Sequence, residues 1–320
     1  MSGKSDSFAF LFPGQGSQRI GMLEEAAASY PVVCATFAEA SDALAVDLWS
    51  LAGNGPEERL NLTEFTQPVL LTASVALWRA WQEQGGGQPA VLAGHSLGEF
   101  SALCCAGVFA LPDAVRIVHE RGRAMQTAVP VGTGAMAAVL GLDDERVRDT
   151  CAAVSAAENA VVEAVNFNAP GQVVIAGHAG AVNAAIDRLR GAGAKRAMLL
   201  PVSAPFHTSL MQPAAERLAA ALDSVALAAP TIPVVNNIDA GVRREPAAIR
   251  EALIRQIAAP VLWTECMACV AGRGVSRAFE CGPGKVLAGL QRRIDKHLVC
   301  TPLEHPADLD AGAADHSAAA

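Results

Sequence analysis

The chain has 320 residues, of which 52% are hydrophobic and 18% charged, a composition typical of a globular α/β protein with a well-buried core. The net charge of −8 argues against a general nucleic-acid binder, because such proteins are usually basic. We find no uninterrupted apolar run of about 18 residues, and the short polar N-terminus does not resemble a secretory signal, so we expect a cytoplasmic protein with no membrane span.

The first part of the chain predicts strands that lead into glycine-rich turns. Residues 8–12 form an apolar run that ends at a Pro-Gly pair, which indicates a buried strand entering a tight loop. Helical spacing follows at residues 70–82. A second apolar run covers residues 90–93, the turn 94–98 comes next, and the pattern is helical from 99 to 107. A strand, a sharp turn and a helix in this order are typical of a parallel sheet.

The middle of the chain has a different pattern. We predict strands at residues 134–141, 161–168, 172–176 and 197–202, and helices at 143–157 and 181–192. This βαββαβ order over about seventy residues is typical of a ferredoxin-like insert. The remaining elements that we predict are a strand at 233–238, helices at 246–257 and 264–272, and a short strand at 277–280.

The turn after the second strand has the pattern of a catalytic serine. Residues 94–98 read Gly-His-Ser-Leu-Gly and match G-x-S-x-G, in which flanking glycines keep side chains out of a crowded strand-to-helix elbow. The helix that follows points its N–H groups and positive dipole toward the reacting oxygen. We therefore predict that Ser96 is a nucleophile. The alternative is an ordinary turn whose serine caps the helix.

A serine nucleophile needs a base. Among the seven histidines, His207 lies in a loop between a predicted strand and helix, where its side chain can face a pocket. The others lie beside the serine, in a polar helix, in a turn, on a basic stretch or in the tail: His95, His119, His178, His297, His305 and His316. Elimination thus favours His207, although a surface-loop histidine stays an alternative.

An oxyanion hole needs two N–H donors. One is the amide after the nucleophile, at Leu97, and a neighbouring loop supplies the other. Residues 14–18 read Gly-Gln-Gly-Ser-Gln and follow the first strand, so Gln15 is the candidate. Neither this loop nor residues 282–285 match a phosphate-binding loop.

Two other features stay open on residue pattern alone. Arg121 and Arg123 lie near the end of a predicted helix, where arginines are usually solvated but can also clamp a substrate carboxylate. Cys266 and Cys269 form a single C-x-x-C in a predicted helix, and without a second ligand pair we predict no metal or redox site. The eight scattered cysteines fit reduced thiols.

Five motifs in order resemble those of the malonyl-CoA:acyl carrier protein transacylases of bacterial type II fatty acid synthesis, an acyltransferase family shared with polyketide synthases. They are residues 12–18 (Phe-Pro-Gly-Gln-Gly-Ser-Gln), 94–99 (Gly-His-Ser-Leu-Gly-Glu), 121–126 (Arg-Gly-Arg-Ala-Met-Gln), 166–172 (Asn-Phe-Asn-Ala-Pro-Gly-Gln) and 282–287 (Gly-Pro-Gly-Lys-Val-Leu). The resemblance extends from about residue 8 to about residue 294.

The resemblance implies a role for each matching position. It makes Ser96 the acylated nucleophile, His207 the general base, and the amides of Gln15 and Leu97 the oxyanion donors. It makes Arg121 the arginine that pairs with the free malonyl carboxylate.

Two further positions follow from the same resemblance. Gln256 matches the residue whose backbone carbonyl orients the histidine, so no acidic third member is expected. Phe206 stands where several bacterial fatty-acid enzymes have a smaller residue, and in polyketide acyltransferases Phe there accompanies malonyl preference. A bulky ring beside the base should crowd a C2 methyl, so we expect malonyl to be preferred over methylmalonyl. Any role of Cys104 and Cys105 is left open.

The resemblance implies an [acyl-carrier-protein] S-malonyltransferase that uses malonyl-CoA and holo acyl carrier protein and needs no metal or redox cofactor. We expect a monomer. Because the carrier is acidic in this family, docking requires a local basic patch, for which the candidates are Arg188, Arg190, Lys195, Arg196, Arg277, Arg292, Arg293 and Lys296. The alternatives are a trans-acting polyketide malonyl transferase, an acyl hydrolase, which the carboxylate clamp Arg121 disfavours, and a non-catalytic carrier-binding protein, which the intact motifs disfavour.

The resemblance and the element order together predict an α/β protein of two domains. Residues 1–129 and 203–303 form a large α/β-hydrolase-like domain with a parallel sheet, and residues 130–202 form the small ferredoxin-like (βαββαβ) insert. We expect the Ala/Asp-rich tail, residues 304–320, to be disordered because it has no periodicity.

Overall fold

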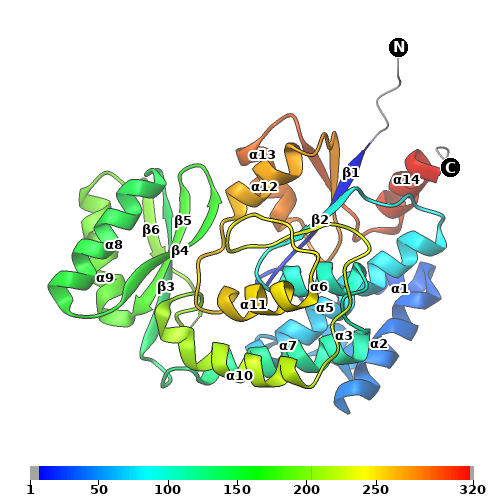
Figure 1. Cartoon of the computed structure of the whole chain (residues 1–320), viewed down its shortest axis with the longest axis horizontal. Helices are drawn as coiled ribbons and strands as arrows, with labels where there is room; N and C mark the ends of the chain where they lie inside the picture. The colour runs from blue at the N-terminus through cyan, green and yellow to red at the C-terminus, as the bar shows by residue number, and fades with distance from the viewer. Residues whose placement is uncertain (1–6, 203, 318–320) are drawn as a thin grey trace.

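Five parallel strands form the larger sheet, in the order β7-β2-β1-β8-β9 (Figure 1). The computed structural model describes residues 7–202 and 204–317. The strands are β1 (Phe8–Phe12), β2 (Val91–Gly94), β7 (Val234–Val235), β8 (Arg277–Glu280) and β9 (Val299–Pro302). β1 and β2 are buried along their whole length, as expected of strands that helices cover on both faces.

Helices cover both faces of this sheet, some packed directly on its strands and others packed on those helices. They are α1 (Glu24–Ser29), α2 (Pro31–Leu44), α3 (Leu48–Asn54), α4 (Glu57–Leu60), α5 (Thr63–Glu83), α6 (Leu97–Cys105), α7 (Leu111–Thr127), the short 3₁₀ helix η1 (Ser209–Met211), α10 (Gln212–Asp223), α11 (Pro246–Gln256), α12 (Trp263–Ala271), α13 (Val286–Ile294) and α14 (Pro306–Ser317). Because side chains alternate along a strand, Phe10 of β1 packs with Trp81 of α5 on one face, whereas Leu11 packs with Trp263 of α12 on the other.

A four-stranded antiparallel sheet forms a second body, at the left of Figure 1. Its elements are β3 (Gly134–Leu140), α8 (Asp144–Glu158), β4 (Val162–Ala169), β5 (Gln172–His178), α9 (Ala179–Gly191) and β6 (Arg196–Leu199). The strand order is β4-β5-β3-β6, and the sheet packs on α8 and α9 through a core of its own that includes Val139, Val147 and Ile175. The predicted α/β fold with an inserted ferredoxin-like unit is therefore confirmed.

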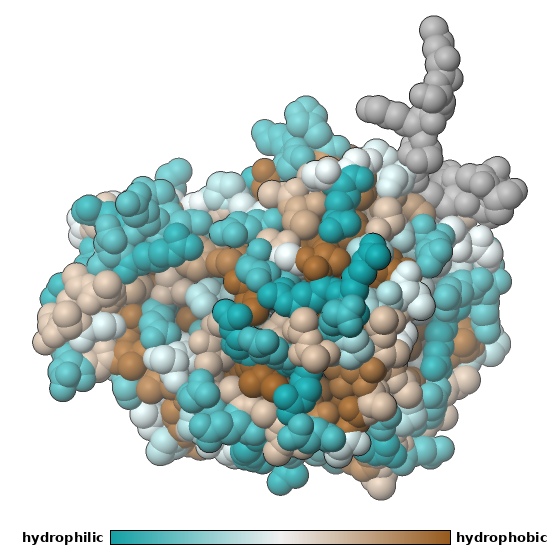
Figure 2. Space-filling view, viewed as in Figure 1, coloured by the Kyte–Doolittle hydropathy of each residue, from teal (hydrophilic) through white to brown (hydrophobic). Residues whose placement is uncertain are grey.

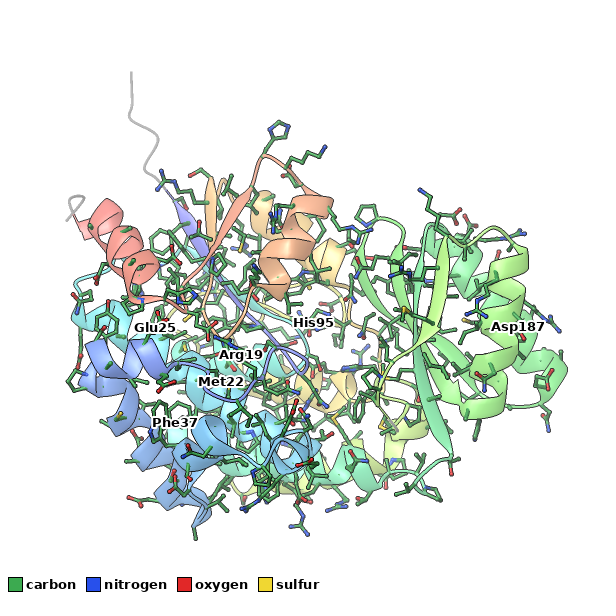
Figure 3. The ribbon with its side chains drawn as sticks, turned by 180° about the vertical axis from the view of Figure 1, so that it is seen from behind. Arg19, Met22, Glu25, Phe37, His95 and Asp187 are labelled. Atoms are coloured by element: carbon green, nitrogen blue, oxygen red, sulfur yellow. The ribbon has the colours of Figure 1, made fainter. Side chains whose placement is uncertain are left out.

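A short backbone pairing joins the two bodies. The edge strand β4 pairs in parallel with the segment before α12: the amide of Phe167 donates to the carbonyl of Val261 at 3.0 Å, and the Val261 amide donates to Val165 at 2.8 Å. Thr264 Oγ1 adds a bond to the Phe167 carbonyl at 3.1 Å. Figure 3 shows His95, the neighbour of Ser96, at the junction between the two bodies, with Asp187 on the far side of the smaller one.

The C-terminal prediction was wrong over most of its range. Residues from Pro306 to Ser317 form α14, and Leu309 and Ala313 are buried against the main core. The hydroxyl of Tyr30, between α1 and α2, donates to Asp310 at 2.6 Å and so connects α14 to the junction of those helices. Small alanines that give no hydrophobic period can still fill a groove between larger neighbours, which is why sequence pattern did not reveal the helix. Residues 318–320 lie outside the described part.

Hydrophilic side chains cover much of the face seen in Figure 2, with apolar residues in scattered patches. Within the described residues, no helix combines the length and the apolar character that a membrane crossing requires.

Candidate active site

Ser96 lies on a strained turn between β2 and α6. Its φ of 53° and ψ of −105° are rare for a residue with a side chain, and such strain is often found at functional sites. The flanking glycines are required sterically: a Cβ at Gly94 would lie 1.9 Å from the carbonyl carbon of Gly98, and a Cβ at Gly98 would lie 2.0 Å from the carbonyl oxygen of Phe12. Only this pair of glycines lets the chain turn tightly enough to lift Ser96 above the sheet.

His207 meets this serine from the loop that follows β6. Its Nε2 lies 2.8 Å from Ser96 Oγ, and its Nδ1 lies 2.9 Å from the carbonyl oxygen of Gln256. A carbonyl can only accept, so Nδ1 carries the proton and Nε2 offers its lone pair to the serine hydroxyl. Burial and the nearby Arg121 lower the pKa of His207 to about 3, so the ring is neutral at physiological pH.

Arg121 of α7 places its guanidinium at the same point. Its side chain is 1% exposed; Nη2 donates to Ser96 Oγ at 3.1 Å and to Gln256 Oε1 at 2.9 Å, and Nη1 donates to Gln67 Oε1 at 2.9 Å. Nε is buried and has no partner among the described residues. Burial lowers the pKa of Arg121 to about 9, whereas Glu99 acts to raise it. A buried cation with an unused donor beside a nucleophile is suited to bind an anionic group.

A cavity of about 140 Å³ opens above these three groups. Gln15 and Leu97 line it, and the structure shows neither backbone amide bonded to another described residue. Both are therefore available as donors to an oxyanion. The rest of the lining comes from both bodies of the molecule: Gln67, His95, Ser96, Arg121, Met125, Met136, Asn166, Leu200, Val202, Phe206 and His207.

The two remaining predicted site residues are also here. Phe206 lines the cavity next to the histidine, as the sequence suggested. Gln256 ends α11, and its side chain as well as its carbonyl belongs to the site. His95 does not face Ser96 Oγ; its Nε2 lies 2.8 Å from Asn168 Oδ1, to which it donates, and its ring lies 5.4 Å from that of Trp263.

A buried polar layer behind Ser96 was not predicted from the sequence. Asn237 Oδ1 accepts from the Ser96 amide at 2.7 Å, and its Nδ2 donates to the Gly94 carbonyl at 2.8 Å. Glu99 Oε2 accepts from Gln256 Nε2 at 2.7 Å and from the Asn237 amide at 2.9 Å. The sequence pattern predicts a strand over 233–238, but β7 ends at Val235 and the turn that follows brings Asn237 to the elbow. A buried polar residue inside an apolar pattern was the available signal.

Other candidates lie elsewhere. Arg123 is half exposed and lies 3.5 Å from Glu120 and 3.9 Å from Glu64, so only Arg121 of the two arginines faces the cavity. Cys104 and Cys105 pack against the main core, and burial raises their pKa values, to about 12 for Cys104, so both remain thiols.

The C-x-x-C pair and the basic residues are also away from the cavity. Cys266 is buried, and its Sγ lies 3.3 Å from the carbonyl of Asn236. Among the described residues, no three His, Cys, Asp or Glu side chains are grouped as a metal site. Arg277 begins β8 and so lies at the sheet edge opposite Ser96, which follows the end of the parallel strand β2.

Comparison with known proteins agrees with this geometry. A model of the acyl transferase domain family matches residues 9–286. A curated malonyl CoA-acyl carrier protein transacylase of Escherichia coli strain K12 is 57% identical over 304 residues, covering 95% of this chain and 98% of that protein. The chain belongs to this acyl transferase family.

Solved structures of the family have the same fold. An acyl-carrier-protein S-malonyltransferase from Burkholderia pseudomallei 1710b is 56% identical with a TM-score of 0.94, over 96% of this chain and 99% of that one. A malonyl-transacylase solved in complex with its type II PKS acyl-carrier protein is 51% identical with a TM-score of 0.95, over 97% and 99%.

Proposed function

We propose that this chain transfers the malonyl group of malonyl-CoA to the phosphopantetheine thiol of acyl carrier protein through a malonyl-Ser96 ester. The observation that carries the proposal is the buried guanidinium of Arg121, 3.1 Å from Ser96 Oγ in the cavity. A cation at that distance from the nucleophile can bind the free carboxylate of an acyl group whose carbonyl lies at Ser96. The curated relatives named as malonyl CoA-acyl carrier protein transacylases support the same activity.

The first half-reaction makes the ester. Ser96 Oγ attacks the thioester carbonyl carbon while Nε2 of His207 takes the hydroxyl proton. The amides of Gln15 and Leu97 hold the negative oxygen of the tetrahedral intermediate, and losing one such donor typically costs about 100- to 1000-fold in rate. The carbon–sulfur bond then breaks, and His207 returns the proton to the CoA sulfur.

The second half-reaction uses the same groups in reverse. The carrier's thiol gives its proton to His207 and its sulfur attacks the ester carbonyl. The carbon–oxygen bond breaks and Ser96 Oγ recovers the proton, which gives ping-pong kinetics. The Gln256 carbonyl keeps the imidazole in the required tautomer throughout, in place of an acidic third member.

Two residues that line the cavity select the acyl group. Arg121 favours malonyl over acetyl, which has no carboxylate to bind. Phe206 lies beside the base and crowds a C2 methyl, so malonyl is preferred over methylmalonyl by about 1–3 kcal/mol, the usual value of one methyl group in a pocket. Transfer of the malonyl group from one thioester to another involves no oxidation or reduction, so the proposal includes no cofactor.

The pathway and compartment belong to the same proposal. We place the enzyme in the fatty acid synthesis of the cytoplasm, where the cysteines, all free thiols in the structure, stay reduced. The alternative carrier is that of a polyketide synthase, which the likeness to the malonyl-transacylase of a type II PKS carrier favours. The ratio of transfer rates to a fatty-acid carrier and a polyketide carrier separates the two.

Intact-protein mass measurement after mixing with malonyl-CoA tests the proposal. We expect a malonyl adduct that forms quickly, is absent in Ser96→Ala, is scarce with acetyl-CoA and is discharged by holo carrier protein. Arg121→Ala should lower malonyl adduct formation by about 10- to 100-fold, since a charge-assisted hydrogen bond typically contributes about 1.5–3 kcal/mol. Release of free malonate with no transferable adduct would instead indicate a hydrolase.

A further inference from the structure

Behind the cavity, the side chain of Gln256 connects the polar groups of the site. Its Nε2 donates to Glu99 Oε2 at 2.7 Å and to the carbonyl of Ser96 at 3.1 Å, while its Oε1 accepts from Arg121 Nη2 at 2.9 Å. The Gln256 side chain is fully buried, so a water molecule from bulk cannot replace these partners. The same residue therefore serves the base through its backbone and the guanidinium through its side chain.

Glu99 gives the shortest of the three contacts that fix which way this carboxamide points; the other acceptors of Nε2 are the Ser96 carbonyl and, at 3.3 Å, Asn237 Oδ1. Glu99 Oε2 accepts two hydrogen bonds and so carries no proton, whether the carboxyl group is ionised or protonated on its other oxygen, and a guanidinium donates and cannot accept. Turning the amide over would set its oxygen against Glu99 and its NH₂ against Arg121, and both contacts would be repulsive. With Glu99 in place, Gln256 Oε1 must face Arg121.

Glu99 is itself fixed to the elbow. The Asn237 amide donates to the same Oε2 at 2.9 Å, and Asn237 Oδ1 accepts from the Ser96 amide at 2.7 Å. Glu99 is 3% exposed and is not part of the cavity lining. On its other side lies a separate space of about 10 Å³, which Arg243 also lines.

The charges around Glu99 are mixed. Burial raises the pKa of Glu99 to about 7, while Arg121 of α7, Arg243 after β7 and the hydrogen bonds from Asn237 and Gln256 act to lower it. The neutral thiol of Cys266 faces it from α12. Burying a carboxylate is energetically unfavourable, so one that is retained in the interior has a structural or functional role.

We propose that Glu99 is a positioning residue for Arg121: by orienting the Gln256 carboxamide, it holds the guanidinium where the free carboxylate of the acyl group binds. The inference rests on the proposed function and deepens it. Selectivity for an acyl group that ends in a carboxylate then depends on a side chain that never touches the substrate. The backbone carbonyl of Gln256, fixed at the end of α11, continues to orient His207 whichever way the carboxamide points.

The test compares two acyl donors in Glu99 variants. In Glu99→Leu, which has similar size but no acceptor, we expect kcat/KM with malonyl-CoA to fall by about 10- to 100-fold, as for a lost charge-assisted hydrogen bond. Acetyl-CoA has no carboxylate for Arg121 to bind, so its kcat/KM should fall much less, and the malonyl-to-acetyl ratio should drop. Glu99→Gln keeps one oxygen able to accept from both Gln256 and Asn237, and it should restore most of the malonyl rate.

A matched control and a second variant complete the design. Glu280 is an equally buried carboxylate that accepts from the Leu287 and Ala288 amides at the start of α13, away from the cavity lining. Glu280→Leu should leave the malonyl-to-acetyl ratio unchanged. Gln256→Met removes the carboxamide and keeps the carbonyl, so it should reproduce the loss of selectivity, and adding Glu99→Leu to it should lower the malonyl-to-acetyl ratio no further.

Three results would overturn the inference. An equal fall with both donors in Glu99→Leu would mean a general loss of structure, as would a changed ratio in Glu280→Leu. An unchanged ratio in both Glu99→Leu and Gln256→Met would mean that Arg121 needs no such support. If Glu99→Leu does not fold, the ratio in Gln256→Met and the recovery in Glu99→Gln decide. A parent enzyme that does not transfer malonyl at all would instead refute the proposed function.

Discussion

At the scale of single residues, the site depends on His207 being neutral while a cation lies beside it. Arg121 donates to the serine oxygen that the imidazole also contacts, so a second positive charge on the ring would be repelled at close range. Burial acts in the same direction, and together the two effects keep the pKa of His207 near 3, far below the usual value of about 6.5. In the proposed mechanism, His207 can therefore accept the serine proton without any prior change of protonation.

This gives a prediction about pH. Because the folded-state pKa is lowered, protonation of His207 should not inactivate the enzyme until the pH approaches about 3, so malonyl-Ser96 formation should show no loss around pH 6.5. Acid-quenched single-turnover mass measurements between pH 5 and 8 check this. The pKa of Glu99 is about 7, so the same pH profile is also measured in Glu99→Gln, which lacks that titrating group. A half-loss near pH 6.5 that persists in Glu99→Gln would contradict a strongly shifted histidine.

At the scale of elements, the elbow between β2 and α6 is a contact between three backbones. Gly98 at the start of α6 rests on the Phe12 carbonyl at the end of β1, and Gly94 at the end of β2 rests on Gly98. The strands and the helix can come this close only where neither residue has a side chain. The height of Ser96 above the sheet is set by that approach.

We therefore predict that Gly98→Ala is severely damaging. Its methyl group would lie 2.0 Å from a backbone oxygen, which cannot move without displacing β1, and we expect a loss of more than about 3 kcal/mol of stability together with the activity. Gly289→Ala is the control: it lies in α13 with nothing within 4 Å of a new Cβ, and it should gain about 0.5–1 kcal/mol. Chemical denaturation of both variants measures the difference, and a well-folded, active Gly98→Ala would be inconsistent with the elbow as described.

The C-terminal helix allows a different test. Removing residues 306–320 deletes the buried Leu309 and Ala313 and the bond between Tyr30 and Asp310. Burying a leucine contributes about 1.5–3 kcal/mol, so we expect a melting temperature lower by several degrees. None of these groups lines the cavity, so kcat/KM at 25 °C should change by less than about twofold. An unchanged melting temperature would show that α14 adds nothing to the core.

Elements of this kind also show what a sequence can and cannot reveal. Ser96 and its glycines were predictable because an elbow requires those residue types at consecutive positions. Elimination among seven histidines favoured His207 but could not show its partner. Glu99 and Asn237 were not predicted, because a carboxylate in the first turn of a helix is common on surfaces and only the packing of α6 against α11 and β7 buries it. A local sequence pattern predicts local geometry only. The residues of a buried network come from distant parts of the chain, so the pattern around each one does not reveal the network.

At the scale of the whole molecule, an acidic protein needs a local basic surface to receive an acidic carrier. Lys285, Arg292 and Lys296 are exposed and line a groove of about 630 Å³ between α13 and β9. Gly284, just before Lys285, lies near Ser17 in the loop that also holds Gln15: a Cβ at Gly284 would lie 3.6 Å from the Ser17 carbonyl oxygen. The Lys285 end of the groove is therefore near the loop that borders the cavity, whereas Arg292 and Lys296, two of the candidates chosen from sequence, lie toward its other end, before β9.

Charge reversal in this groove should affect one substrate only. We expect Arg292→Glu with Lys296→Glu to raise the KM for the carrier about tenfold at low salt, with the effect fading as ionic strength rises, and to leave the KM for malonyl-CoA unchanged. Arg188→Glu with Arg190→Glu, on α9, is the control at the same change of charge. If both pairs of substitutions raised the KM for the carrier equally, the effect would come from the net charge of the protein, and the groove would not be the docking face.

The pairing of β4 with Val261 has a consequence for how such an enzyme diversifies. Two main-chain hydrogen bonds fix the distance between the two bodies that line the cavity. Main-chain hydrogen bonds do not depend on which side chains the strand carries. Residues such as Met136, Leu200 and Phe206 can therefore be exchanged by mutation while the gap keeps its width. The preference for an acyl group can therefore change between duplicated genes without a change of fold. Protein engineers can likewise substitute the residues that line the cavity while its width is kept.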